Sequence, residues 1–301
     1  DEEDAEYLKT LNNLSLAYAD LGQFPQAEAL LLKSLHIREK VYGEESLPFA
    51  TALQSIANFY RNLGRYAAAE PLLNKCKDIR LKLLGCYSRD YANAVNSLAA
   101  IYLEMERYEE AEPLLRVAIG IIDSLEGKSD PGMLMNLATA NLHLGRFEEA
   151  EQFNLEALEA FEIQQKKETS WYAVNLSNYG LLHQQLGNFD EAEKRYRQAL
   201  GILQKMDTPP PASLALVLAN LGAILILKNQ YEEAEEFLME AKNLQAKRLG
   251  LEHKDYANSL SNLGYLYQNM KKWSQAEQYH LESIAIGEKN GFDYSGALSN
   301  L

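Results

Sequence analysis

The sequence predicts an all-α protein, an α-solenoid built from helix-turn-helix units, on three observations. An aromatic residue followed three and four residues later by Ala-Glu occurs seven times in the 301 residues. Successive aromatics are 42 residues apart, except for one interval of 39 between the third and the fourth. The residues between them have the apolar spacing of helices, and a fixed period of this length is typical of stacked repeats. The aromatics are Phe24, Tyr66, Tyr108, Phe147, Phe189, Tyr231 and Trp273.

The stretch before each aromatic predicts the first helix of a unit. Leu11–Tyr18, Val95–Tyr102 and Leu260–Tyr267 carry apolar residues at i, i+3 and i+7. This spacing places them on one face of an α-helix, where they can pack against a neighbouring helix.

A short turn is expected two residues before each aromatic. Four units have glycine there, which adopts the left-handed conformation of a helix exit at little cost. The other three have Glu106, Asn229 and Lys271, so we expect their turns to be rebuilt or slightly strained, least so at Asn229. The four glycines are Gly22, Gly64, Gly145 and Gly187.

The second helix of each unit is expected to begin near the Ala-Glu pair. Acidic residues such as Glu109, Glu148 and Glu232 fall in its first turn, where they interact favourably with the helix dipole. The alanine is present in all seven units, which predicts a point where two helix backbones approach too closely for a larger side chain. The alanines are Ala27, Ala69, Ala111, Ala150, Ala192, Ala234 and Ala276.

The whole chain, residues 1–301, is therefore expected to be a single array. The last ten residues, FDYSGALSNL, match KDYANSLSNL of the seventh unit, so residues 292–301 are expected to start an eighth, truncated unit. We also expect the chain to be a fragment of a longer protein. The approximate unit boundaries are 8–49, 50–91, 92–130, 131–172, 173–214, 215–256 and 257–291.

Composition and charge narrow the kinds of partner. The chain is 47% hydrophobic, and its 29 Lys and Arg against 43 Asp and Glu give a formal charge of −14. A chain with this hydrophobic content is expected to fold. Its net negative charge repels nucleic acid and anionic membranes, so we expect a protein or peptide partner that is neutral to mildly basic. The sequence shows no membrane-spanning run, and its start lacks the features of a signal peptide. The two cysteines support no disulfide framework, so a reducing, cytoplasmic setting is expected.

The aromatic, the small-residue site and the Leu/Tyr spacing resemble tetratricopeptide repeats (TPR). The 42-residue period, with segments such as His36–Glu45 and Leu244–Ala257, is most similar to the repeats of kinesin light chains and their bacterial relatives. The resemblance covers the whole chain. It implies a right-handed superhelix that acts as a scaffold or adaptor in protein–protein interactions. The heptad coiled coil that would bind a kinesin heavy chain is absent from the sequence, so a motor role is not supported.

In this family the first helices line a concave groove, and the resemblance implies that groove residues lie at fixed distances before the turn. Nine residues before the turn, most units carry Asn, whose amide both donates and accepts, as an extended peptide backbone requires. These residues are Asn13, Ser55, Ser97, Asn136, Asn178, Asn220 and Asn262, with Asn300 in the eighth unit. Further polar groove residues are Gln54, Asn58, Arg61, Asn62, Asn93, Asn96, Asn258, Ser261 and Tyr265.

One part of the predicted groove is apolar. In the sixth unit the groove positions include Leu216, Ala223, Ile226 and Leu227, which could accept a hydrophobic side chain of a ligand. The charged groove residues sum to zero and do not form a basic clamp for a C-terminal carboxylate, so an internal peptide segment fits better. The charged residues are Lys9, Asp20, Arg61 and Glu104.

Alternatives to peptide binding remain open. The Asn and Ser residues could instead bridge adjacent first helices. The chain could also be the sensor or autoinhibitory arm of a larger enzyme, such as a caspase-like protease or a nucleotide-switch ATPase, or it could form homo-oligomers through its uncapped ends.

Neither catalysis, a cofactor nor a metal ion is expected. The sequence has no glycine-rich phosphate loop and no plausible nucleophile–base set. His143 and His183 lack a third ligand and are interpreted as packing residues. Cys76 occupies a small-residue site and is expected to be buried, whereas Cys86 is expected in an accessible loop.

Overall fold

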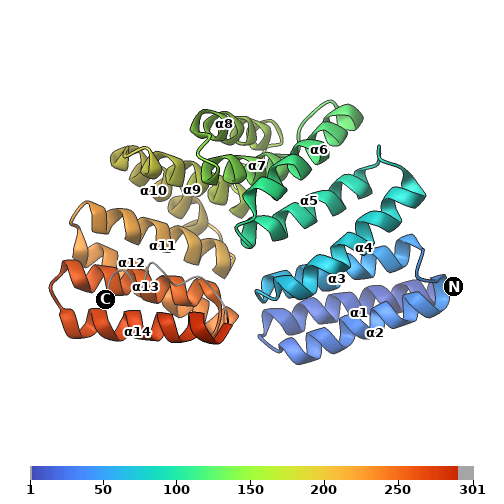
Figure 1. Cartoon of the computed structure of the whole chain (residues 1–301), viewed down its shortest axis with the longest axis horizontal. Helices are drawn as coiled ribbons and strands as arrows, with labels where there is room; N and C mark the ends of the chain where they lie inside the picture. Colours follow the sequence, from blue (N-terminus) through green and yellow to red (C-terminus); the bar gives the residue numbers. More distant parts are fainter. Residues whose placement is uncertain (1, 291–301) are drawn as a thin grey trace. The chain divides into compact units, whose positions relative to one another are not determined.

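The computed structural model describes residues 2–290, and this part of the chain contains fourteen α-helices and no strand (Figure 1). The prediction of an all-α helical repeat protein is confirmed. The helices are α1 (Glu2–Asp20), α2 (Phe24–Tyr42), α3 (Leu47–Asn62), α4 (Tyr66–Leu84), α5 (Arg89–Glu104), α6 (Tyr108–Glu126), α7 (Pro131–His143), α8 (Phe147–Ile163), α9 (Ser170–Gln185), α10 (Phe189–Gln204), α11 (Pro211–Leu227), α12 (Tyr231–Leu249), α13 (Lys254–Asn269) and α14 (Trp273–Asn290).

The helices follow one another along the chain as seven consecutive pairs, α1 and α2 through α13 and α14, and each pair corresponds to one repeat of the sequence. The chain divides into two compact units, Asp1–Ala160 and Phe161–Leu301, here called the N-terminal and the C-terminal unit. First helices begin at residues 47, 89, 170, 211 and 254, three or four residues before the unit boundaries expected from the sequence. Residues 292–301, including Asn300, lie outside the described residues.

All seven turns have the same left-handed conformation, whether or not glycine is present. The φ angles are 70° at Gly64 and 60° at both Glu106 and Asn229. At Lys271 φ is 59°, and the following N–H closes the turn on the Tyr267 carbonyl at 2.9 Å. The three turns without glycine are therefore not rebuilt, and their residues adopt a conformation that is unfavourable for a side chain.

Polar side chains define where several first helices begin. Ser46, Ser88 and Thr169 each accept a hydrogen bond from the backbone N–H three residues later. Asp130 accepts from two backbone N–H groups at the start of α7. Helix α11 differs, because Pro210 and Pro211 start it without a side-chain cap. Proline is suited to this position, since it has no N–H to satisfy.

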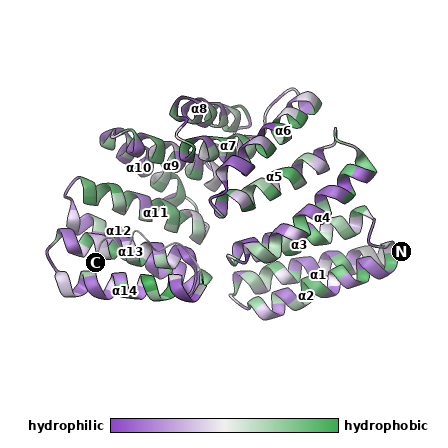
Figure 2. Cartoon of the chain, viewed as in Figure 1, coloured by the Kyte–Doolittle hydropathy of each residue, from purple (hydrophilic) through white to green (hydrophobic). Residues whose placement is uncertain are grey.

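The core follows the alanines of the Ala-Glu pairs. Six of the seven alanines are 0% exposed and Ala276 is 5% exposed, which confirms the predicted close approach of helices. Figure 2 shows most helices with both hydrophobic and hydrophilic residues, whereas α11 is predominantly hydrophobic. The buried residues of α11 include Val217, Leu218, Leu221 and Ile224.

Candidate functional site

The glutamate of the Ala-Glu pair joins one repeat to the next. In the N-terminal unit, the hydroxyl of Tyr60 donates to Glu28 Oε1 at 2.7 Å. The Arg65 guanidinium lies 3.1 Å from the same carboxylate and 4.3 Å from the centre of the Tyr60 ring. Burial, with the Glu28 carboxylate, raises the pKa of Tyr60. These groups are bonded to each other across the boundary between two repeats, so they help to hold the repeats together.

The same kind of contact joins other repeats. Arg107 contacts Glu70 at 3.0 Å and lies 4.1 Å from the centre of the Tyr102 ring. In the C-terminal unit, the Tyr267 hydroxyl donates to Glu235 at 2.6 Å. Sequence reasoning missed these joints, although a tyrosine four residues before the turn recurs with the repeat period and could have indicated them.

Two pairs of groove residues in the N-terminal unit bridge adjacent first helices. Asn136 Nδ2 on α7 donates to Asn96 Oδ1 on α5 at 3.1 Å. Gln54 Nε2 on α3 donates to Ser97 Oγ on α5 at 2.9 Å. At these positions the side chains bridge adjacent first helices, which is the structural alternative to peptide binding. Part of their hydrogen-bonding capacity is therefore used.

Other groove residues keep their side-chain amides unbonded. Within residues 2–290, the side chains of Asn13, Asn58, Asn93 and Asn262 make no hydrogen bond. Asn13 is exposed and the other three are half-buried. Their donors and acceptors are accessible, so these four meet the chemical requirement for contacting a peptide backbone.

The remaining polar candidates vary in exposure. Arg61 is half-buried and Asn62 is exposed, both at the end of α3. Asn178 on α9 is half-buried and interacts with other residues. Tyr265 on α13 is 38% exposed, which leaves much of its ring accessible.

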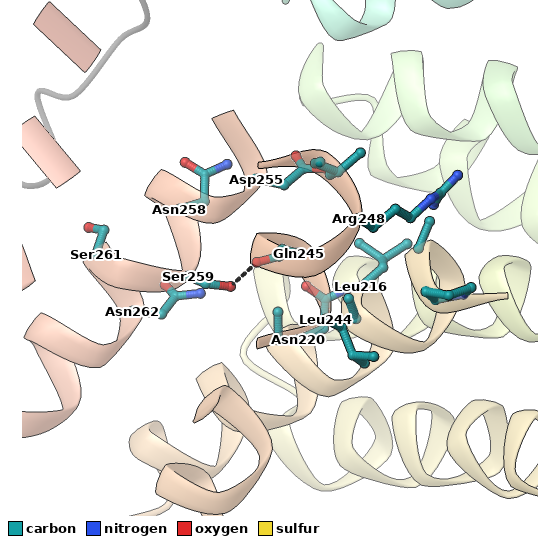
Figure 3. Close-up of a pocket in the computed structure, with 15 residues that line it drawn as sticks. Leu216, Asn220, Leu244, Gln245, Arg248, Asp255, Asn258, Ser259, Ser261 and Asn262 are labelled. Atoms are coloured by element: carbon teal, nitrogen blue, oxygen red, sulfur yellow. Dashed lines mark hydrogen bonds between the residues drawn. The ribbon is translucent and has the colours of Figure 1, made fainter. Parts of the chain in front are cut away.

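The C-terminal unit contains a pocket of about 380 Å³ between α11, α12 and α13 (Figure 3). Predicted groove residues Leu216 and Asn220 from α11 and Asn262 from α13 line this pocket together. Asn258 and Ser261, also predicted, complete the wall on α13. The pocket therefore brings residues from two adjacent first helices to one concave surface.

The pocket also contains residues from a second helix, which sequence reasoning missed. Gln245 and Arg248 near the end of α12 line it, as does Asp255 at the start of α13. Gln245 is 8% exposed, and its Oε1 accepts a hydrogen bond from Ser259 Oγ at 2.6 Å. The groove positions taken from the family lie on first helices alone, so residues of α12 were not considered.

The predicted apolar patch is only partly accessible. Leu216 and Leu227 are 39% and 40% exposed, and Ala223 is half-buried. Ile226 is 3% exposed, so its side chain packs in the core and does not line the groove. The sequence does not separate the exposed from the buried apolar residues of α11, because that helix is predominantly hydrophobic.

The titratable candidates have structural surroundings. The His143 ring stacks on Tyr108 at 4.3 Å between centroids, and burial lowers its pKa. Cys76 is fully buried, which raises its pKa to about 11 and makes it unreactive, whereas Cys86 is exposed. Within residues 2–290, no three His, Cys, Asp or Glu side chains are grouped as metal ligands.

Helix length and hydropathy bear on membrane contact. Over the described part of the chain, no helix is both long and apolar enough to cross a membrane.

The paired helices and their shared turn define a helical repeat protein. Family models described as tetratricopeptide repeat match residues 8–47, 48–124, 131–205 and 213–289. Because these matches cover most of the sequence, the chain belongs to the tetratricopeptide repeat family. A comparison with curated protein sequences finds no match.

Solved structures with similar folds include kinesin light chain-like proteins. BtubC (BKLC) from P. vanneervenii has a TM-score of 0.57 and 24% identity, covering 73% of this chain and 89% of that chain. A putative kinesin light chain repeat protein from Podosopora anserina has a TM-score of 0.55 and 22% identity, over 66% and 95% of the two chains. At these identities the likeness concerns the fold, and it confirms the kinesin light chain-like resemblance.

A third similar structure is NprR in complex with its cognate peptide NprX. Its TM-score is 0.66 at 18% identity, covering 98% of this chain and 82% of that chain. The fold is therefore shared with a protein that has been solved with a bound peptide.

Proposed function

We propose that the chain is a non-catalytic protein–protein interaction module, an adaptor that binds an extended peptide segment of a partner. The pocket between α11, α12 and α13 carries this proposal, because groove residues from two first helices meet there. The comparisons indicate no catalytic family.

Unbonded amides favour a peptide ligand. An extended peptide presents one N–H and one C=O per residue, and each needs a partner once it leaves water. Asn258 and Asn262, on the wall of the pocket, make no side-chain hydrogen bond within residues 2–290. They can donate to and accept from a peptide without breaking an existing bond between repeats.

The charge of the groove favours an uncharged or mildly basic segment. The groove positions of the C-terminal unit carry Asn, Gln, Ser and apolar residues and no charge. In the N-terminal unit, Lys9 and Arg61 balance Asp20 and Glu104. A strongly charged peptide would find no surplus of opposite charge on these faces, whereas the net charge of −14 attracts basic segments at long range.

The complex of NprR with its cognate peptide supports the same class of ligand. It is an example of a peptide held by a protein of similar fold. The identity of 18% transfers neither the sequence of that peptide nor its contact residues to this chain.

Selection from a displayed library of random dodecapeptides tests the proposal. The purified chain should enrich a family of related peptides, and an enriched peptide can be synthesised for affinity measurement by fluorescence anisotropy. The double variant Asn258→Ala/Asn262→Ala should weaken binding about tenfold, the loss expected for one or two net hydrogen bonds. Asn243→Ala, on the exposed face of α12, is the matched control and should leave the affinity unchanged.

The N-terminal unit has its own candidate pair for the same experiment. Asn58→Ala/Asn93→Ala removes two amides that make no hydrogen bond within residues 2–290, so it should not disturb the helices. A loss of affinity in this variant instead would place the peptide on the N-terminal unit. Failure to enrich any peptide, or equal affinity for the parent and both double variants, would contradict groove binding.

A further inference from the structure

One polar side chain in the pocket has a hydrogen-bond donor without a partner. Gln245 is 8% exposed, and its Oε1 is occupied by the hydrogen bond from Ser259 Oγ at 2.6 Å (Figure 3). This bond fixes which end of the amide is free. Within residues 2–290 nothing accepts a hydrogen bond from Gln245 Nε2. Its Nε2 group is therefore able to donate to a ligand that enters the pocket.

A second side chain in the same pocket has a free acceptor. Asn220 Nδ2 donates to Ser177 Oγ on α9 at 3.0 Å, so the orientation of this amide is fixed as well. In the described part of the chain, Asn220 Oδ1 receives no hydrogen bond. The two amides of fixed orientation therefore offer one donor, on α12, and one acceptor, on α11, beside the unbonded amides of Asn258 and Asn262 on α13.

We propose that this pocket binds the side-chain amide of a glutamine in the bound peptide. The ligand carbonyl accepts from Gln245 Nε2, and the ligand NH₂ donates to Asn220 Oδ1. This inference rests on the proposed peptide-binding function and adds the residue type that the pocket selects.

The rest of the pocket fits the aliphatic part of a glutamine. Ala215, Leu216 and Ala219 form an apolar wall on α11 beside Asn220. A volume of about 380 Å³ is large enough for a single long side chain. The two methylene groups of glutamine can pack on this wall while the amide reaches the polar end.

Other ligand side chains fit less well. A carboxylate would place an acceptor against Asn220 Oδ1, and the pocket lining carries one anion, Asp255, as well as one cation, Arg248. An ammonium group would place a donor against Gln245 Nε2. A leucine would fill the apolar part but would cover the Gln245 donor without supplying an acceptor, and the loss of one such hydrogen bond corresponds to about tenfold in affinity.

Synthetic variants of one selected peptide test the inference without altering the protein. Dodecapeptides enriched on the parent chain should share a glutamine at one position. Replacing it with leucine or with glutamate should each raise the dissociation constant about tenfold, measured by fluorescence anisotropy. Enriched peptides without a shared glutamine, or equal affinity after its replacement, would overturn the glutamine pocket while the peptide-binding function stands.

A protein variant gives a second measurement. Gln245→Glu keeps the shape of the side chain and the bond from Ser259 but replaces the free donor with an acceptor. It should weaken binding of the glutamine-containing peptide about tenfold, so that this peptide no longer binds more tightly than its glutamate and leucine versions. Gln26→Glu, exposed on α2, adds the same charge and should change nothing. Unchanged discrimination in a folded Gln245→Glu chain would contradict the assignment, whereas no enrichment of any peptide would overturn the binding function itself.

Discussion

The N-terminal and C-terminal units carry different small residues at the position where the first helix of a repeat packs closely against the second. Seven residues before the turn, the second, third and fourth repeats carry alanine, at Ala57, Ala99 and Ala138, all 0% exposed. The fifth, sixth and seventh repeats carry glycine. These are Gly180, Gly222 and Gly264.

In the C-terminal unit, a second-helix side chain occupies the space of the missing Cβ. A Cβ at Gly180 would lie 2.8 Å from the Tyr196 ring, and one at Gly264 would lie 2.6 Å from the His280 ring. At Gly222 it would lie 2.5 Å from Leu238. The comparison teaches that the repeat fixes where a small residue is needed, whereas the local approach of the two helices decides between alanine and glycine.

Replacing one of these glycines with alanine should have the largest effect on the stability of the chain. Gly222→Ala forces a Cβ into Leu238 and should destabilise the chain by about 1–3 kcal/mol, the usual cost of overpacking. Gly201→Ala is the matched control, because its Cβ would meet nothing within 4 Å. It should stabilise α10 by about 0.5–1 kcal/mol, because alanine is the better helix former. Urea unfolding of both variants measures the difference, and a neutral Gly222→Ala would show that the helices can separate freely.

Removal of a buried imidazole should have the next largest effect. His280 is 1% exposed, neither ring nitrogen has a partner within residues 2–290, and burial lowers its pKa. Four other repeats carry leucine at this position, at Leu31, Leu73, Leu115 and Leu238. His280→Leu should therefore stabilise the C-terminal unit by roughly 1–2 kcal/mol, because it removes unsatisfied buried nitrogens.

The effect of His280 should depend on pH. Because the pKa is lowered in the folded state, the unfolded chain binds a proton that the folded chain rejects, so stability is lost as the pH falls below about 6.5. The gain from His280→Leu should grow in that direction in thermal unfolding. His36→Leu, with an exposed side chain, controls for the lost charge. A gain that is the same at neutral and acidic pH would show that His280 takes up a proton equally in the folded and unfolded states.

The turns should give the smallest effect. The N-terminal unit has one turn without glycine, at Glu106, and the C-terminal unit has two, at Asn229 and Lys271. Lys271→Gly removes a side chain from a residue whose backbone is left-handed. It should stabilise the chain by about 0.5–1 kcal/mol, measured by thermal unfolding. Asn229→Gly should gain less, because it also removes the hydrogen bond from the Tyr231 hydroxyl at 2.6 Å. Equal gains would mean that this bond contributes nothing to the turn.

Periodicity made the fold predictable, but it could not separate surface from core on α11. The seven aromatic and Ala-Glu signals located every turn and every second helix, because each repeat makes the same local contacts. On α11 the same reasoning placed Ile226 with Leu216 and Leu227 in the groove, although Ile226 is 3% exposed. An apolar residue at a groove position is compatible with either environment, and only packing distinguishes them.

For the candidate site, the sequence identified residue types and missed their partners. It indicated Asn96, Asn136 and Asn220 as groove amides, and the first two prove to be bonded to each other. It did not indicate Gln245 or Arg248, because they come from a second helix and reach the pocket only where α12 ends beside α13. Such contacts join residues that are not related by the repeat period.

The sequence by itself determined that this protein is a tetratricopeptide array of paired helices, because periodic apolar positions and close-approach alanines are local properties that recur in every repeat. The tertiary structure decided which amides bridge helices and which remain free. It also decided where glycine replaces alanine and that Gln245 and Asn220 line one pocket. These features depend on distances between side chains of different helices, and those distances are set by how the whole set of neighbouring side chains fills space.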